Sequence, residues 1–160
     1  MKLIIDALKA GNKIMICGNG GSASDAAHFT AELVGRFVKE RKPLPCIDLT
    51  SSNATITAIA NDYGYDQVFA RQVQAHGKRG DVLIVLTTSG NSENCIQAMR
   101  VAQPLGVKCV IISGPKNSKI DDEMTGNDKF ILADGSTTAE IQEETIKVLH
   151  SICEAIDENF

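Results

Sequence analysis

Alternation between short apolar runs and longer helical stretches constrains the fold of this chain more than any other feature of its sequence. Five runs rich in β-branched residues predict strands, at residues 13–17, 46–49, 82–86, 108–112 and 130–133. Most of these runs lack polar alternation, which is typical of strands buried on both faces of a sheet.

Helical periodicity occupies the segments between the runs, at about residues 24–37, 66–76, 92–102 and 138–156. Strands that alternate with helices connect through right-handed crossovers, which produce a parallel sheet covered by helices on both sides. We therefore predict an α/β fold, a three-layer α/β/α sandwich around a five-stranded parallel sheet. With 160 residues and no visible linker or repeat, the chain 1–160 is expected to form a single domain.

The charge and cysteine content exclude several classes of partner and site. A net charge of −4, without any block of Lys or Arg, gives no electrostatic footprint for nucleic acid or an anionic membrane. Asp6 interrupts the apolar N-terminus and no apolar run approaches ~18 residues, so neither export nor a membrane anchor is expected, and the chain is assigned to the cytoplasm. Five widely spaced cysteines favour reduced core residues over a disulfide set or a zinc knot.

The loop after the first predicted strand, residues 18–22, is a candidate phosphate cradle. Its glycines let backbone N–H groups approach an anion, and the helix N-terminus that follows adds partial positive charge. For this loop alone, a purely structural role is equally well supported: Gly20 and Gly21 would allow a tight turn, and Ser22 and Ser24 would cap the helix. The loop matches neither the dinucleotide fingerprint nor a Walker motif, so no nucleotide cofactor is expected.

A second loop shifts the balance toward phosphate. Thr87, Thr88, Ser89 and Ser92 place four hydroxyls within six positions at another junction between a strand and a helix. One capping residue would suffice there, whereas hydroxyls together with a helix N-terminus can bind phosphate without Lys or Arg. A third polar loop, residues 113–115, follows the fourth strand, and ligands bind at these carboxyl ends in open α/β sheets.

Four polar residues on two predicted helices form the candidate catalytic or metal group. His28 and Glu32 stand four residues apart and share one helix face, and Gln142 and His150 lie on the last helix. Taken separately, they also suit a half-buried His/Glu pair and a polar fringe on a packed helix. Taken together, they suit a mixed nitrogen and oxygen metal site or an acid–base pair. Because Gln142 and His150 are ~12 Å apart along a helix, one ion reaches both only if the side chains lean together or come from different subunits.

Several linked motifs in order resemble those of the phosphoheptose isomerases of the sugar-isomerase (SIS) domain family. The resemblance extends from about Leu8 to Ile156 and rests on residues 17–22, 28–36, 58–64, 88–92 and 141–143 and on His150. It implies an aldose–ketose isomerase that interconverts D-sedoheptulose 7-phosphate and D-glycero-D-manno-heptose 7-phosphate, supplying heptose for lipopolysaccharide or capsule. It also implies a homotetramer with sites shared between subunits.

The resemblance implies roles for individual residues. Glu32 and His150 match the catalytic acid–base pair, and His28, Glu32, Gln142 and His150 match the zinc ligands of metal-containing members. A carboxylate and an imidazole can move the protons of an enediol mechanism, and zinc would polarise the carbonyl; whether the two roles coexist is open. The implied substrate contacts are Asn19, Gly20, Gly21, Ser22, Glu32, Asn61, Asp62, Thr87, Thr88, Ser89, Ser92 and Gln142.

The chain also departs from the family pattern. Relatives usually carry further helical sequence before the equivalent of Leu8, which leaves the oligomer geometry open. Ala139-Glu140 replaces a pair that usually ends in Arg, and Thr145 stands where histidine is frequent.

Two non-catalytic functions are alternatives to an isomerase activity for a chain with these motifs. The DnaA-initiator-associating protein has the same fold and loops but lacks the acidic residue at Glu32 and the histidine at His150, so their presence here favours the enzyme. A sugar-phosphate-sensing domain needs no acid–base pair and usually carries a DNA-binding segment, for which 160 residues leave no room.

Overall fold

A five-stranded parallel sheet organises the computed structural model, which describes residues 1–114 and 117–160. The strand order is β2-β1-β3-β4-β5. The strands are β1 Ile14–Cys17, β2 Cys46–Asp48, β3 Val82–Thr87, β4 Lys108–Ser113 and β5 Lys129–Leu132. Each predicted strand is confirmed to within one residue at either end. Of the predicted loop at residues 113–115, Pro115 lies outside the described residues.

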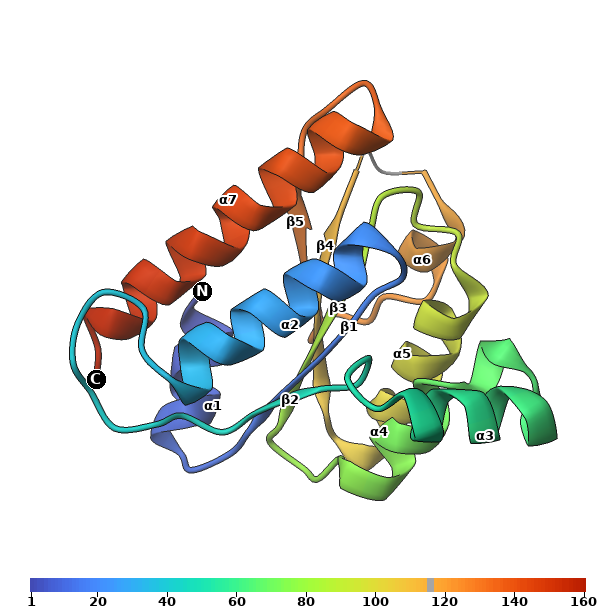
Figure 1. Ribbon diagram of the computed structural model, residues 1–160, viewed down its shortest axis with the longest axis horizontal. Helices are drawn as coiled ribbons and strands as arrows, with labels where there is room; N and C mark the ends of the chain where they lie inside the picture. Colours follow the sequence, from blue (N-terminus) through green and yellow to red (C-terminus); the bar gives the residue numbers. More distant parts are fainter. Residues whose placement is uncertain (115–116) are drawn as a thin grey trace.

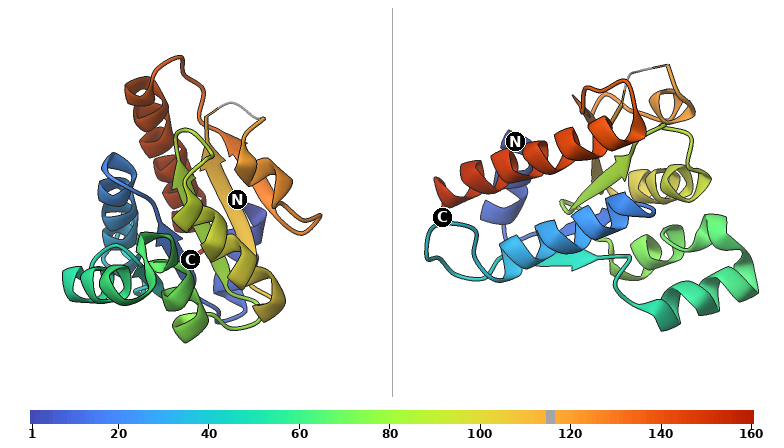
Figure 2. Two further views of the ribbon diagram at one scale, coloured as in Figure 1. Left: turned by 90° about the vertical axis from the view of Figure 1, so that its right-hand side faces the viewer. Right: turned by 45° about the horizontal axis from the view of Figure 1, so that its top comes forward.

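Helices cover both faces of this sheet, as the three-layer prediction requires (Figures 1 and 2). One face carries α1 Lys2–Lys9, α2 Gly21–Val34 and α7 Thr138–Asp157. The other face carries α3 Asn53–Tyr63, the short 3-10 helix η1 Tyr65–Gln67, α4 Ala70–His76, α5 Glu93–Leu105 and α6 Lys119–Asp122.

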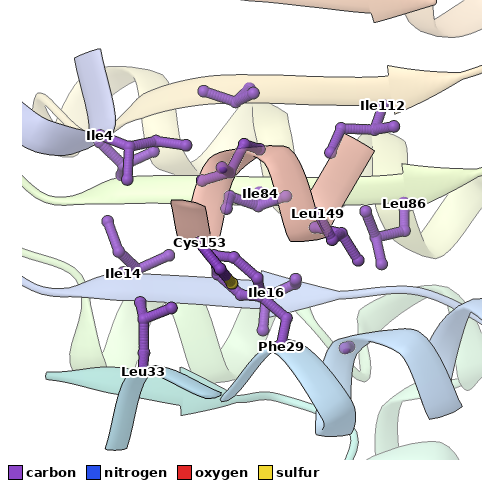
Figure 3. Close-up of a cluster of buried hydrophobic side chains, with 14 of the residues drawn as sticks. Ile4, Ile14, Ile16, Phe29, Leu33, Ile84, Leu86, Ile112, Leu149 and Cys153 are labelled. Atoms are coloured by element: carbon purple, nitrogen blue, oxygen red, sulfur yellow. The ribbon is translucent and has the colours of Figure 1, made fainter. Parts of the chain in front are cut away.

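The strand residues divide the core into two layers, because successive side chains of a strand point to opposite faces. Ile14 and Ile16 of β1 join Phe29 of α2 and Leu149 of α7 in one cluster (Figure 3). Met15 and its equivalents on the other strands pack instead against α4 and α5. Each buried aliphatic or aromatic side chain contributes about 1.5–3 kcal/mol, so α2 and α7 are held firmly side by side over the sheet.

The expectation of strands buried on both faces is wrong for the edges of the sheet. Cys46 and Ile47 of β2 are half-buried, and Lys129 and Leu132 of β5 are exposed. An edge strand lacks a neighbour on one side, and the helices do not cover it completely. The five cysteines are free thiols, and all but Cys46 are buried, as predicted for core residues.

The helix predictions are confirmed in type but not in every boundary. The predicted segment 66–76 divides into η1 and α4, and α1, α3 and α6 were not predicted. Within the described part of the chain, no helix has the length and apolar character needed to cross a membrane.

Candidate active site

The loop between β1 and α2 depends on glycine. Gly20 has a φ of +58°, a conformation that side chains rarely adopt, and it is the N-cap of α2 without a side-chain hydrogen bond. A Cβ on Gly18 would lie 2.7 Å from the Cβ of Ser22, which is itself buried. The helix therefore begins at Gly21, three residues before the predicted start, and the reading in which Ser22 and Ser24 cap it is wrong.

The first turn of α2 lies against the first turns of α7. A Cβ on Gly21 would be 2.8 Å from the Cδ of Gln142 and would overlap its amide nitrogen. Only a residue without a side chain allows the amide of Gln142 to lie in this position. Gln142, a predicted substrate contact and metal ligand, therefore lies beside the loop at residues 18–22, here called the glycine loop.

His28, Glu32 and His150 meet between α2 and α7 and are here called the His28 cluster. The Nε2 atom of His28 lies 3.1 Å from Oε1 of Glu32 and 3.5 Å from Nε2 of His150. The two imidazole rings meet edge to face, with centroids 5.2 Å apart. Residues from two distant parts of the sequence thus form one group, and His28 bridges the predicted acid–base pair.

The surroundings of the His28 cluster are partly open and partly apolar. The side chain of His28 is 46% exposed and that of Glu32 is 22% exposed, so a small molecule can reach both. The ring of Phe37 lies 5.4 Å from that of His150 and closes one side.

Asp25 lies one turn before His28 on α2, and the sequence analysis missed it. Its Oδ2 atom is buried and, among the described residues, has no hydrogen-bond partner. Burial raises the pKa of this carboxyl above its ordinary value, and the nearby His28 opposes that shift. The three-residue spacing from His28 was the available signal, because it places both residues on one helix face.

The predicted zinc ligands fit the metal in chemistry but not in arrangement. Imidazole nitrogens and a carboxylate oxygen are usual zinc ligands, and the two separations around His28 are close to the ~3.3 Å edge of a zinc tetrahedron. Among the described residues, however, no three His, Cys, Asp or Glu side chains are grouped as a metal site. Gln142 lies against Gly21, about 12 Å from His150 along the helix. The four side chains do not form a closed zinc site in this arrangement.

The loop after β3, residues 87–92 and here called the hydroxyl loop, contains internal hydrogen bonds and ends at an N-cap whose side chain makes no capping hydrogen bond. Thr87 is buried, and its Oγ1 accepts a hydrogen bond of 3.1 Å from the backbone N–H of Gly90. Thr88 is half-buried and Ser89 is exposed. Ser92 is the N-cap of α5, and its side chain makes no capping hydrogen bond. Ser92 therefore leaves the first backbone N–H groups of α5 uncapped by its own side chain, as an anion site at this helix end requires.

Asn61 and Asp62 lie apart from the His28 cluster. Both are exposed on the last turn of α3, and Nδ2 of Asn61 donates to Oδ1 of Asp62 at 2.8 Å. Within the described part of one chain, no hydrogen bond or ion pair joins either side chain to the cluster.

Asn19 is engaged by two residues that the sequence analysis did not single out. Its side chain forms hydrogen bonds with Asn94 on α5 and with Tyr65 on η1. The position of Asn94, two residues after the hydroxyl loop, was the only sequence signal for this contact.

Two of the departures from the family pattern have local structural roles. Glu140 completes a capping box with Thr137 at the start of α7, where its Oε2 accepts the N–H groups of Ser136 and Thr137. Thr145 is buried, and its hydroxyl donates to the backbone oxygen of Ile141 at 2.8 Å. Glu140 stabilises the start of α7, and the buried hydroxyl of Thr145 finds its hydrogen-bond partner within the helix.

Comparison with known proteins identifies the family of this chain. A family model described as "SIS domain" matches residues 1–114. A phosphoheptose isomerase from Campylobacter concisus is 46% identical over 159 residues, which cover 99% of this chain and 82% of that protein. Solved structures of the phosphoheptose isomerases from Francisella tularensis and Neisseria gonorrhoeae superpose with TM-scores of 0.94 and 0.92; each is 39% identical, over 98% of this chain and 82% of the other. The chain belongs to the SIS domain family and, within it, to the phosphoheptose isomerases.

Proposed function

We propose that this chain interconverts D-sedoheptulose 7-phosphate and D-glycero-D-manno-heptose 7-phosphate and supplies heptose for lipopolysaccharide or capsule. The observation that carries the proposal is the His28 cluster, in which a carboxylate and an imidazole from different helices meet at a partly exposed position. The names of the similar proteins support the same reaction.

The isomerisation moves one proton between C1 and C2 and another between their oxygens, and Glu32 with His150 supplies groups suited to both transfers. A proton on Nε2 of His28 lies within reach of Oε1 of Glu32 and of Nε2 of His150. His28 therefore orients both groups and can exchange protons with either.

The hydroxyl loop and the start of α5 would hold the phosphate. No cluster of Lys or Arg is needed for this, because backbone N–H groups at a helix N-terminus and hydroxyl donors can bind the anion. The phosphate then anchors one end of an extended sugar, whose other end carries the reacting carbons to Glu32 and His150.

The direct test is to incubate the purified chain with sedoheptulose 7-phosphate and to follow formation of the aldose. Glu32→Gln keeps the shape of the side chain but removes the basic carboxylate, so turnover should fall by about 10²-fold or more with the fold preserved. The matched control is Glu144→Gln on α7, where the carboxylate pairs with Lys147 at the surface. Near-normal turnover of the Glu32 variant would remove this residue from the chemistry, and an inactive parent chain would refute the reaction.

Zinc binding by His28, Glu32, Gln142 and His150 is a separate proposal. The donor types support it, and the bound ion would polarise the substrate carbonyl. Binding requires that the side chains of Gln142 and of the His28 cluster lean toward one ion or come from different subunits. Metal analysis of the purified chain should find close to one zinc per chain, and His28→Ala should lose it. Metal-free protein with full activity would refute a required zinc.

We also propose that this chain forms a homotetramer in the cytoplasm and that its active sites are shared between subunits. Asn61 and Asp62 support sharing, because they are predicted substrate contacts yet lie apart from the His28 cluster of their own chain. Sedimentation equilibrium should give four times the chain mass of 17.1 kDa. A mixed oligomer of Glu32→Gln and Asp62→Asn chains should regain the activity that each variant alone lacks. A monomer mass would refute both the tetramer and the sharing of sites between subunits.

A further inference from the structure

The carboxamide of Asn19 is fully occupied by other side chains. Its Oδ1 accepts hydrogen bonds from Nδ2 of Asn94 at 2.8 Å and from the hydroxyl of Tyr65 at 3.0 Å. Its Nδ2 donates to Oδ1 of Asn94 at 2.9 Å and also faces Sγ of Cys95 at 3.9 Å. Since an amide offers two donors and one oxygen with two lone pairs, none of its capacity is left for a ligand.

Asn94 is the buried centre of this arrangement, here called the amide knot of Asn19, Asn94 and Tyr65. The residue is only 3% exposed, and its Oδ1 accepts the backbone N–H of Cys95 at 3.0 Å as well as Nδ2 of Asn19. Leaving a buried amide without partners is costly, so the reciprocal pair with Asn19 fixes both side chains.

The amide knot joins three segments that carry predicted substrate contacts. Asn19 belongs to the glycine loop, Asn94 follows the N-cap Ser92 of α5, and Tyr65 begins η1, shortly after Asn61. Figure 1 shows that the start of α2, the start of α5 and the end of α3 come from separate parts of the chain.

We propose that Asn94 and Tyr65 are positioning residues, which act through Asn19 to hold the glycine loop, the phosphate-binding start of α5 and the segment after α3 at a fixed spacing. The proposal rests on the proposed isomerase function. In this proposal, Asn19 contacts the substrate only through its backbone. Its side chain fixes the distance between the two segments that bind the two ends of the sugar.

This role has a specific kinetic consequence. If the start of α5 moves relative to α2, the phosphate still binds but the reacting carbons no longer lie correctly against Glu32 and His150. A misplacement of about 1 Å can cost ~10²-fold in rate. Loss of the amide knot should therefore lower kcat more than it raises KM.

The test is a double-mutant cycle on the isomerisation with Asn19→Ala, Asn94→Ala and the double variant, assayed at a temperature where circular dichroism finds all of them folded. Each single change should lower kcat/KM by about tenfold, chiefly through kcat, and the double variant should be no worse than the poorer single variant. The control is Gln97→Ala on the same helix, whose amide donates to Glu93 at the surface, and it should match the parent.

Tyr65→Phe keeps the proposal testable if Asn94→Ala does not fold, because it removes one hydroxyl from an exposed ring. It should lower kcat by a few-fold, and it should have no such effect in the Asn19→Ala background. Losses that multiply in the double variant, losses confined to KM, or unchanged kcat in Tyr65→Phe would each overturn the proposal. Because the parent and Gln97→Ala must turn over sugar phosphate in the same assay, an inactive parent would refute the isomerase function instead.

Discussion

At the scale of the residue, Asp157 at the end of α7 holds the loop that follows α2. Its carboxylate accepts the backbone N–H groups of Val38 and Lys39, each at 2.9 Å, and Nε of Arg41 at 3.0 Å. Burial by itself would raise the pKa of Asp157, but the N–H groups of Lys39 and Val38 and the Arg41 guanidinium together hold it below its ordinary value. The side chains of Arg41 and Asp157 are 1% and 3% exposed, so this ion pair is buried.

Asp157→Asn should therefore destabilise the fold at pH 7 by about 3 kcal/mol, because it leaves the buried Arg41 without its counter-charge. A pKa lower in the folded than in the unfolded state gives stabilisation that is present above the unfolded value, near 3.8, and is lost as pH falls through the folded value. Urea unfolding should find the gap between parent and variant constant near neutrality and smaller at pH 3. The control is Asp6→Asn, whose exposed pair with Lys2 should change stability by less than ~0.5 kcal/mol. A gap that widens in acid would contradict the assignment.

Sequence patterns could predict which polar residues are candidates for the site, but not how these residues are connected. The four-residue spacing of His28 and Glu32 predicted a shared face, and these two residues are indeed in contact. The contact with His150 depends on how α2 packs against α7, which no local pattern encodes. Asn94 was missed for the same reason, since its partner Asn19 is distant in sequence. Asp25 was missed although its three-residue spacing from His28 was visible in the sequence.

At the scale of the element, the start of α2 separates two uses of glycine. Gly20 needs its positive φ, although a Cβ there would meet nothing, whereas Gly21 is needed because a Cβ would reach the amide of Gln142. Alanine at Gly20 should cost about 1–3 kcal/mol of stability through backbone strain, because the ψ of −121° lies outside the left-handed helical region that other residues occasionally adopt. Alanine at Gly21 meets only the end of a flexible side chain, which can move away.

Gly21→Ala should consequently lower isomerase activity severalfold while leaving the unfolding temperature nearly unchanged, because it displaces Gln142 from the glycine loop. Steady-state kinetics and thermal unfolding of the same preparation check both parts. In a Gln142→Ala background, the change at Gly21 should have no further effect on activity. If Gly21→Ala lowers activity equally in both backgrounds, it acts on the loop itself and not through Gln142.

Elements were predictable from sequence where burial is continuous. The central strands β3 and β4 are buried almost throughout, so their apolar runs located them to within a residue. The helix α3 was missed because none of its residues is fully buried and its β-branched Thr and Ile give no clear helical stripe. The helix α1 places Ile4, Ala7 and Leu8 on one face, but eight residues are too few to establish a period.

At the scale of the whole molecule, the parallel pairing of β1 with β3 brings the glycine loop and the hydroxyl loop to neighbouring strand ends, where α2 begins (Figure 1). The His28 cluster lies between α2 and α7, farther along α2. In the proposed function, a sugar phosphate extends from the start of α5 toward these helices. The sequence correctly predicted only that the two loops follow strands of the same parallel sheet. The separation of Asn61 and Asp62 from the His28 cluster could not be predicted from the sequence, because this separation depends on where α3 packs.

The phosphate end of the proposed orientation rests on hydroxyls, because residues 18–22 and 87–92 include no Lys or Arg. Replacing Ser89 and Ser92 together by Ala should weaken binding of a sugar phosphate by about tenfold or more, since it removes two donors beside the start of α5. The helix should stay folded: Ser92 makes no side-chain capping bond, and Asn91 continues to accept the N–H of Lys119 at 3.1 Å. Calorimetric titration with a phosphorylated sugar and its unphosphorylated form isolates the effect, since only the former should bind less tightly. If the double variant binds the phosphorylated sugar as well as the parent does, the anion lies elsewhere, and the reacting carbons cannot be placed at Glu32 and His150 by this anchor.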